Sequence, residues 1–169
     1  TTYKKINYLI ENDLIKKKLK KIRILEFGVD KGISTSLFLR FCQKTRSKLY
    51  SVDIINYSKL FNNKNWTFIN CRDDNYQAVI KIVKKNLDII FLDTQHTAKH
   101  VEKIFYMYFK KLKKNGLFII DDISWLPYSK NEWRDNEWIE KNNRDTFFKL
   151  LDIYNNNKKN LDISFFFKD

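Results

Sequence analysis

The chain has 169 residues, of which 43% are hydrophobic and 16% aromatic, and it carries a formal net charge of +13. This length and composition exclude intrinsic disorder and predict a single domain, over 1–169, with a core of its own. No apolar run approaches the roughly 20 residues of a membrane-spanning helix, and the first residues, TTYKKINYLIENDL, lack the apolar stretch of a signal peptide. Cys42 and Cys71 match no metal-binding spacing. We therefore expect a cytoplasmic protein with two reduced thiols and no membrane partner.

The positive charge invites a nucleic-acid partner. The lysines, however, are scattered over every predicted helix, and the chain is rich in Lys, Asn and Ile while holding only three glycines and one proline. Such a composition is typical of a genome-wide codon bias as much as of a selected basic surface. Because no zinc-finger, helix-turn-helix or RNA-recognition signature concentrates the charge, a nucleic-acid partner is disfavoured but stays open.

Predicted helices and strands alternate along the chain. Apolar residues at helical spacing predict a first helix over 3–20, and short runs that are apolar on both faces predict strands. The later elements, in chain order, are a strand over 22–27, a helix over 34–45, strands over 48–54 and 66–70, a helix over 75–85, a strand over 87–93, a helix over 98–114, a strand over 116–121, a helix over 142–154 and a strand over 162–167. This alternation is typical of a doubly wound, Rossmann-like α/β fold, a mostly parallel sheet with helices on both faces.

Acidic residues stand at the carboxyl end of each of the first five predicted strands. They are Glu26, Asp53, the pair Asp73 and Asp74, Asp93, and the pair Asp121 and Asp122. Ligands of open α/β sheets bind beyond the carboxyl ends of the strands. An acid is also a common turn residue, but acids at every one of these ends favour a binding site along this edge.

A glycine turn follows the first predicted strand. Gly28 and Gly32 stand in the stretch EFGVDKGIS, where glycine permits a tight turn and a close approach to the helix start, and where Ser34 can cap that helix. Asp53 lies 21 positions after Gly32, at the end of the next strand, where a carboxylate can bind both hydroxyls of a ribose. Asp53 alone could be a turn residue, but the two features together favour a nucleoside-containing cofactor.

The segments ILEFGVDKGISTSLF, YSVDI, LDIIFLDTQH and NGLFIIDDIS, in this order, resemble class I S-adenosylmethionine-dependent methyltransferases over roughly residues 20–123. The closer resemblance is to the branch of catechol O-methyltransferase, macrolide-sugar O-methyltransferases and cephalosporin-hydroxylase-like proteins. It implies that S-adenosylmethionine binds the glycine turn, the acid after the second strand and the end of the third strand. The matching positions are Glu26, Gly28, Gly32, Ser34, Asp53, Arg72 and Asp73. Arg72 departs from the small or polar residue that is usual there.

The same resemblance implies a metal site. In the metal-dependent members of this branch, acids at the ends of the fourth and fifth strands bind one divalent cation, and Asp93, Asp121 and Asp122 match them. Such oxygen ligands suit Mg²⁺, or Ca²⁺ or Mn²⁺, better than Zn²⁺. His96 falls where those enzymes place a basic side chain, which implies catalytic roles for His96, as proton acceptor, and for Asp93. A lone histidine is more often an ordinary surface residue.

These expectations describe a metal-assisted O-methyltransferase acting on a small molecule or sugar. A vicinal diol is favoured as acceptor because one cation can chelate two neighbouring hydroxyls and so orient them. A nucleic-acid methyltransferase stays open as an alternative, although the stretch DTQH lacks the Pro-Pro turn common in enzymes that methylate base amino groups. A non-catalytic cofactor-binding relative and a homodimer also stay open.

The C-terminal third is less regular. Six strands are predicted, whereas the family usually has seven, so the last strand is expected to be missing or trimmed. The segment 123–145 contains three of the four tryptophans, Trp125, Trp133 and Trp138, together with Pro127. We expect this segment to form a substrate-facing lid; the alternative is that its tryptophans only pack the loop onto the domain or onto a second subunit.

Overall fold

The computed structural model describes residues 7–8, 10, 20–84, 86–123 and 137–165. Internal contacts divide the chain into two compact units, the first made of 1–94 and 107–121 and the second of 95–106 and 122–169. Within the described ranges, no helix is long and apolar enough to cross a membrane. The single domain expected over 1–169 stays a prediction, and the two units are described separately below.

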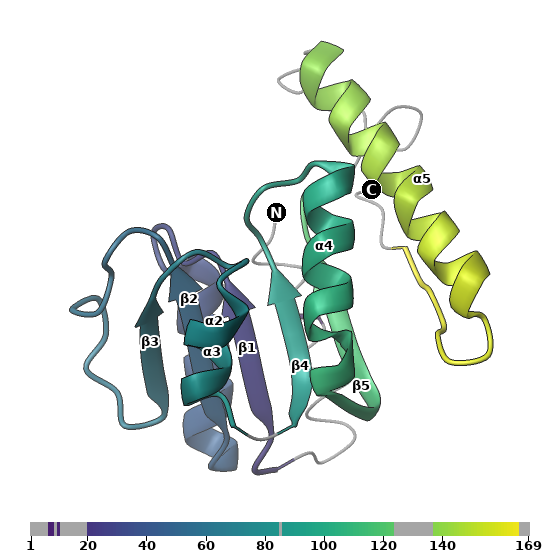
Figure 1. The fold of residues 1–169 in the computed structure, drawn as a ribbon. Helices are drawn as coiled ribbons and strands as arrows, with labels where there is room; N and C mark the ends of the chain where they lie inside the picture. The colour runs from purple at the N-terminus through teal and green to yellow at the C-terminus, as the bar shows by residue number, and fades with distance from the viewer. Residues whose placement is uncertain (1–6, 9, 11–19, 85, 124–136, 166–169) are drawn as a thin grey trace. The chain divides into compact units, whose positions relative to one another are not determined.

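The first unit contains one five-stranded sheet with the order β3-β2-β1-β4-β5 (Figure 1). Every neighbouring pair of strands is parallel, which confirms the predicted Rossmann-like α/β class. The strands are β1 (Arg23–Phe27), β2 (Lys48–Asp53), β3 (Trp66–Asn70), β4 (Leu87–Leu92) and β5 (Leu112–Ile120). All five overlap predicted strands, because each contains a short apolar run.

The strand order reverses at β1. The chain moves outward from β1 to β2 and β3, then returns to place β4 on the other side of β1. The register pairs Phe27 with Val52 and with Leu92, and Leu92 with Ile120. The residues that follow these strands therefore leave the sheet at one edge, on either side of the point where the order switches. This is the place where open α/β sheets bind ligands.

Helices α2 (Ile33–Thr45) and α3 (Tyr76–Ile82) lie on opposite faces of this sheet (Figure 1). The α2 face holds a buried cluster, whose members are Ile10, Ile22, Ile24, Leu37, Phe38, Leu39, Phe41, Cys42, Leu49, Ile89 and Phe91. On the other face the ring of Phe27 lies 4.8 Å from that of Tyr108, which in turn lies 5.3 Å from the ring of Tyr76 at the start of α3. Both faces are thus covered by apolar side chains, as a parallel sheet requires.

The second unit contains most of α4 (Ala98–Tyr108) and the whole of α5 (Glu137–Asn157). Polar contacts join α5 to the segment 95–106. The hydroxyl of Thr146 donates to the carbonyl of His96 at 2.8 Å, the ammonium of Lys149 lies 3.3 Å from the carboxylate of Glu102, and the amide of Asn157 lies 3.3 Å from the hydroxyl of Tyr106. The start of α4 and the whole of α5 therefore form a helical unit without a sheet of its own among its described residues.

The predicted helix over 98–114 is too long. The helix ends at Tyr108, a 3-10 turn covers Phe109–Lys111, and β5 begins at Leu112 rather than at residue 116. The early start of β5 depends on a bulge, because Leu112 pairs with Leu87 whereas Leu117 pairs with Ile89. Residues 112–114 therefore join the sheet edge, where the ammonium of Lys113 lies 2.6 Å from the carboxylate of Asp88.

Three other predictions concern the chain ends. The helix predicted over 3–20 lies largely outside the described residues. Helix α5 starts at Glu137, earlier than the predicted start at 142. The strand predicted over 162–167 is wrong for 162–165, which are not in a strand, and 166–167 lie outside the described residues. Phe165 instead packs on Phe147 of α5, with ring centroids 4.6 Å apart, so its apolar surface is covered by a helix and not by a neighbouring strand.

Candidate functional site

The turn after β1 packs directly against the end of β4. Gly28 has a φ of 93°, and its amide donates to the carbonyl of Val52 at 3.0 Å. A Cβ added to Gly28 would lie 1.9 Å from the carbonyl oxygen of Asp93, a distance that no side chain can occupy. Gly28 is therefore required twice, by its backbone conformation and by the close approach of the chain at Asp93.

Gly32 ends the same turn and precedes α2. Its φ is 73°, and an added Cβ would lie 2.7 Å from Cδ2 of Leu60 and 2.9 Å from the ring of Phe61. The sequence suggested that a ligand or a strand approaches this glycine. In the structure, side chains of the loop after β2 occupy that space, so Gly32 lets this loop pack on the helix start.

Asp53 connects β2 to the glycine turn. Its Oδ2 accepts the amide hydrogen of Val29 at 2.8 Å, and its Oδ1 accepts that of Ile55 at 2.9 Å. The side chain is half-buried, and a carboxylate has about four lone-pair positions, so each oxygen can accept a further hydrogen bond. Asp53 thus shapes the turn and keeps acceptor positions at the edge of the sheet, and its role in ribose binding stays a prediction.

Glu26 is fully buried beneath the turn. Its Oε1 accepts the hydroxyl of Ser34 at 2.6 Å, and its Oε2 accepts those of Thr35 at 2.8 Å and Ser51 at 2.5 Å. Burial raises the pKa of Glu26 from 4.5 to about 7, an effect that the three hydroxyl donors only partly offset. The cap expected at Ser34 is wrong, because the N-cap of α2 is Gly32 and the Ser34 hydroxyl bonds Glu26.

Sequence reasoning missed Thr35, Ser51 and Trp66 as members of this network. The indole of Trp66 donates to the hydroxyl of Ser51 at 3.0 Å. One signal was available in the sequence. Glu26 lies two residues after Ile24 in the same strand, so both side chains point to the face that α2 covers, and a buried acid there needs hydroxyl partners.

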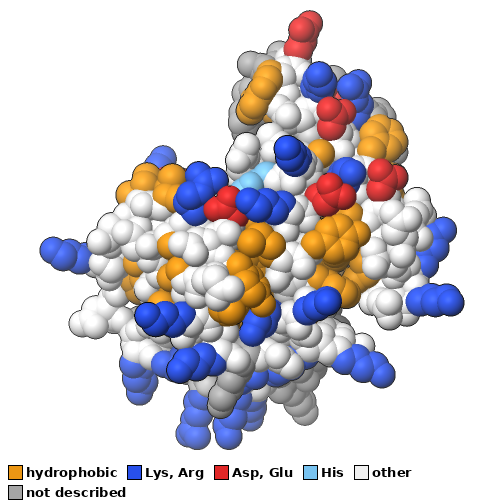
Figure 2. Space-filling model, in the orientation of Figure 1, with side chains coloured by type: hydrophobic (Ala, Val, Ile, Leu, Met, Phe, Trp, Pro, Cys, Tyr) orange, Lys and Arg blue, Asp and Glu red, His pale blue; other side chains and the backbone are white. Residues whose placement is uncertain are grey.

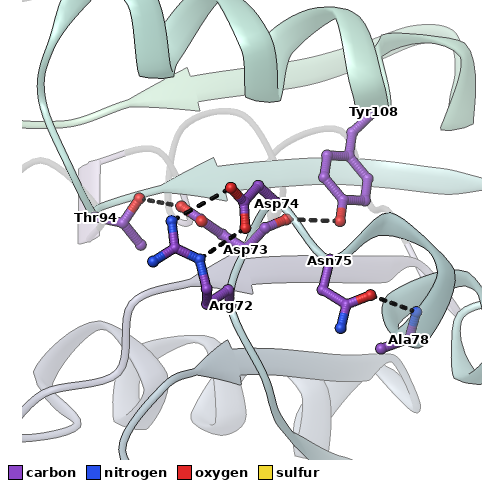
Figure 3. Close-up of polar contacts among 7 residues, drawn as sticks. All are labelled: Arg72, Asp73, Asp74, Asn75, Ala78, Thr94 and Tyr108. Carbon is purple, nitrogen blue, oxygen red and sulfur yellow. Dashed lines mark hydrogen bonds and ion pairs between the residues drawn. The ribbon is translucent and has the colours of Figure 1, made fainter.

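The residues after β3 form a compact polar cluster (Figure 3). The guanidinium of Arg72 binds the carboxylate of Asp74 through two contacts of 2.9 and 3.3 Å. Asp73 accepts the hydroxyl of Thr94 at 2.6 Å on its side chain and that of Tyr108 at 2.8 Å on its carbonyl. Arg72 is therefore engaged by its neighbour, whereas Asp73 joins the end of β3 to the residue after Asp93. Thr94 and Tyr108 were not anticipated as partners.

The acids expected to bind a metal follow two neighbouring strands. Asp93 comes directly after β4 and Asp121 directly after β5, and the amide of Asp121 donates to the carbonyl of Leu92 at 3.0 Å. In the second unit, His96 and Asp122 offer ligand atoms that lie within 4.8 Å of each other. Carboxylate oxygens suit Mg²⁺, Ca²⁺ or Mn²⁺, so the acids fit the expected kind of cation, whereas an imidazole ligand is more typical of transition metals. Exposed acids often occur without a metal, and the metal site stays a prediction.

The expected lid is only partly described. Trp125, Pro127 and Trp133 lie outside the described residues. Trp138 stands in the first turn of α5, and 69% of its surface is exposed. Residues 137–145 are therefore helical and not part of a loop.

The basic residues do not gather at one place on the face drawn in Figure 2, where Lys and Arg side chains are scattered among apolar and uncharged ones. This agrees with the scatter of lysines along the sequence. The surface drawn therefore offers no concentrated basic patch for a polyanionic ligand.

The sheet order and the glycine turn at its switch point are those of a Rossmann-like α/β fold that can bind a cofactor at this edge. A family model described as a methyltransferase domain matches residues 25–123, more than half of the 169 residues. The chain belongs to this methyltransferase-domain family, which confirms the resemblance seen in the sequence. A search of curated proteins finds no match.

Solved structures with the same fold include several methyltransferases. The MycE methyltransferase of mycinamycin biosynthesis, solved with Mg and SAH, superposes with a TM-score of 0.66 and 19% identity over 94% of this chain and 42% of its own. The SAH-bound methyltransferase PaMTH1 of Podospora anserina superposes with a TM-score of 0.64 and 16% identity, over 89% of this chain and 69% of its own. CalS11, a TDP-rhamnose 3'-O-methyltransferase of calicheamicin biosynthesis, superposes with a TM-score of 0.61 and 10% identity, over 90% of this chain and 69% of its own. The chain thus spans about two fifths of the length of MycE.

Proposed function

We propose that this protein is an S-adenosylmethionine-dependent O-methyltransferase that uses a divalent cation and acts on a hydroxyl of a small molecule or sugar, with a vicinal diol favoured. The observation that carries the proposal is the turn at Gly28, closed on the Asp93 carbonyl and tied to Asp53 through Val29. This contact brings the expected cofactor turn next to Asp93, one of the expected metal ligands, in a chain of the methyltransferase-domain family, and so supports the proposal.

The residues present fit the cofactor. Positive φ angles at Gly28, Asp30 and Gly32 curve the backbone at the start of α2, and Asp53 keeps acceptor capacity for ribose hydroxyls. S-adenosylmethionine, when bound, would supply an already activated methyl group. The chain then has to hold the cofactor, orient the acceptor and exclude water, and positioning of this kind can contribute several kcal/mol to lowering a barrier.

A cation site at Asp93, Asp121 and Asp122 would serve the acceptor. The parallel pairing of β4 with β5 brings the backbones of Asp93 and Asp121 to one edge, and Asp122 follows in the chain. A divalent cation, when bound, would acidify and orient an acceptor hydroxyl. That the MycE complex contains Mg together with SAH supports a metal, and the sugar substrate of CalS11 supports a sugar acceptor.

His96 is the proposed proton acceptor. Its backbone is fixed by the bond from Thr146 of α5 to its carbonyl, and its imidazole lies near the carboxylate of Asp122. A neutral imidazole nitrogen can accept the proton of an acceptor hydroxyl as the oxygen attacks the methyl group. Asp93 would act with it as a ligand and not as a base.

Calorimetric titrations with SAH, with MgCl₂ and with both test this proposal. We expect each to bind, with tighter binding of Mg²⁺ when a catechol diol is present. Transfer of labelled methyl groups to diol acceptors and to polynucleotides separates the two enzyme classes, since a nucleic-acid methyltransferase would label the polynucleotide. SAH binding without any Mg²⁺ binding would contradict the metal-assisted mechanism while leaving the cofactor assignment intact.

A further inference from the structure

The carboxyl group of Glu26 is enclosed in a way that ordinary strand-end acids are not. It has no exposed surface, and all three of its side-chain partners, Ser34, Thr35 and Ser51, are hydroxyl donors at 2.5–2.8 Å. An ionised carboxylate can only accept hydrogen bonds, so this arrangement is suited to the charged form. The indole of Trp66 supports the same direction of donation by bonding the Ser51 oxygen.

The position of Glu26 connects the three parts of the proposed cofactor cradle. Glu26 lies two residues before Gly28, Ser34 and Thr35 lie in the first turn of α2, and Ser51 lies two residues before Asp53. The partial positive charge at the start of α2 also favours a negative charge at this place. A negative charge on Glu26 would therefore lower the electrostatic potential at the turn, although Glu26 itself has no contact with solvent.

The other groups that influence Glu26 do not neutralise it. Asp53 from β2 is an acid whose charge raises the pKa of Glu26, and Cys42 from α2 is a buried thiol with a pKa raised to about 12, chiefly by burial and also by the Glu26 charge. The residue that pairs with Glu26 across β4 is Phe91, which is apolar. Burial and the hydroxyl donors thus act against each other, and Glu26 can change its ionisation near neutral pH.

We propose that Glu26 is a specificity-determining residue that does not touch the cofactor: its buried negative charge makes the site prefer the positively charged sulfonium cofactor over its uncharged thioether product. This inference rests on the proposed function, because it requires the cradle to bind S-adenosylmethionine. The sulfonium carries one positive charge more than the thioether of S-adenosylhomocysteine. Binding of the sulfonium therefore favours ionised Glu26 and releases a proton where Glu26 is protonated, whereas binding of the thioether does not.

The test compares the affinities for S-adenosylmethionine and S-adenosylhomocysteine between pH 5.5 and 8.5, in the natural protein and in Glu26→Gln. Glutamine keeps the shape and can keep the hydroxyl network, because a serine or threonine hydroxyl can reverse its direction. We expect the preference for the sulfonium to rise with pH through about 7 in the natural protein. The rise should be on the order of tenfold, because the two charges attract each other without being in contact. In Glu26→Gln the preference for the sulfonium should lose the increase with pH that ionisation of Glu26 causes. Titration of the ligands' own amino groups is common to both proteins.

Thr35→Val provides a second variant. It removes one hydroxyl donor while keeping the acid, so the midpoint of the pH dependence should move to higher pH. If Glu26→Gln does not fold, calorimetry of the natural protein in two buffers of different ionisation enthalpy measures proton release directly, and release with the sulfonium but not the thioether is expected near pH 7. An equal pH dependence in both proteins, or no release, overturns the proposal. Absence of binding of either compound at any pH overturns the proposed function and this inference with it.

Discussion

The Cα of Gly28 faces the carbonyl oxygen of Asp93 so closely that a Cβ would lie 1.9 Å from it. Gly28 begins the turn after β1 and Asp93 directly follows β4, so this contact sets the spacing between the proposed cofactor loop and the first proposed metal ligand. The amide of Asp93 in turn donates to the carbonyl of Phe27 at 2.9 Å. Backbone contacts therefore connect the turn after β1 to the residue that follows β4.

Gly28→Ala should destabilise the protein much more than Gly32→Ala. Both glycines have positive φ, which costs alanine about 1–2 kcal/mol. At Gly32 the added carbon meets the ends of the Leu60 and Phe61 side chains, which can move, whereas at Gly28 it meets a backbone carbonyl. We expect a loss of roughly 4 kcal/mol or more for Gly28→Ala and about half of that for Gly32→Ala, measured by urea unfolding. Equal losses would show that the β4 end moves freely away from the turn.

Asp53→Ala should weaken the binding of S-adenosylhomocysteine by about 1–3 kcal/mol, as expected for the loss of hydrogen bonds to a charged acceptor. The substitution also removes the acceptors of the Val29 and Ile55 amides, so the turn itself loosens. Asp30→Asn is the matched control, because it removes a negative charge from the same turn at an exposed position. Calorimetry should show affinity close to normal for that control. Unchanged affinity in Asp53→Ala would remove the ribose assignment.

The positions of the strands and of the acids after them could be predicted because both depend on short, local stretches of sequence. Short apolar runs place the strands, and Asp53, Asp93 and Asp121 must then emerge at the carboxyl edge of a parallel sheet. The end of the helix before β5 could not be predicted, since the bulge that starts β5 at Leu112 depends on pairing with Leu87, a residue 25 positions earlier. Non-local pairing of this kind leaves no periodic signal.

The hydrogen-bond partners of individual side chains were the second feature that could not be predicted from the sequence. Ser34 has the residue type and position of a helix cap, yet its hydroxyl bonds Glu26. Glu26 resembles the other strand-end acids, yet it points into the interior, while Asp53 stays half-exposed at the edge. Glu26 lies inside β1, on the face that α2 covers, whereas Asp53 is the last residue of β2, so the two acids have different roles.

His96→Ala should leave Mg²⁺ binding within about twofold of normal and lower methyl transfer by about 10²–10⁴-fold, the range of general base catalysis. Asp122→Asn should instead lower Mg²⁺ affinity about tenfold or more, because it removes a carboxylate ligand. Asp145→Asn, a substitution of a half-exposed acid of α5, controls for the change in net charge. Because His96 and Asp122 offer ligand atoms within 4.8 Å of each other, loss of Mg²⁺ binding in His96→Ala would identify His96 as a ligand and contradict its role as base.

The unfolding free energy should depend on pH through Glu26. Its pKa is raised from 4.5 in the unfolded chain to about 7 in the folded protein, chiefly by burial. Below pH 4.5 both states are protonated and the contribution of Glu26 is at its most favourable. Between pH 4.5 and 7 the unfolded chain loses its proton while the folded protein keeps it, so stability falls as pH rises and levels off above pH 7. The loss is on the order of 3 kcal/mol.

Other carboxylates titrate in the same range, so the measurement is the difference between the natural protein and Glu26→Gln in urea unfolding from pH 4 to 8.5. Glutamine does not ionise, and its curve should cross or approach that of the natural protein as the pH rises. Thr35→Val should shift the range of falling stability upward, since it removes one donor that favours ionised Glu26. Parallel curves for the natural protein and Glu26→Gln would mean that Glu26 has the same pKa in the folded and unfolded states, because only a group that titrates differently in the two states changes the slope.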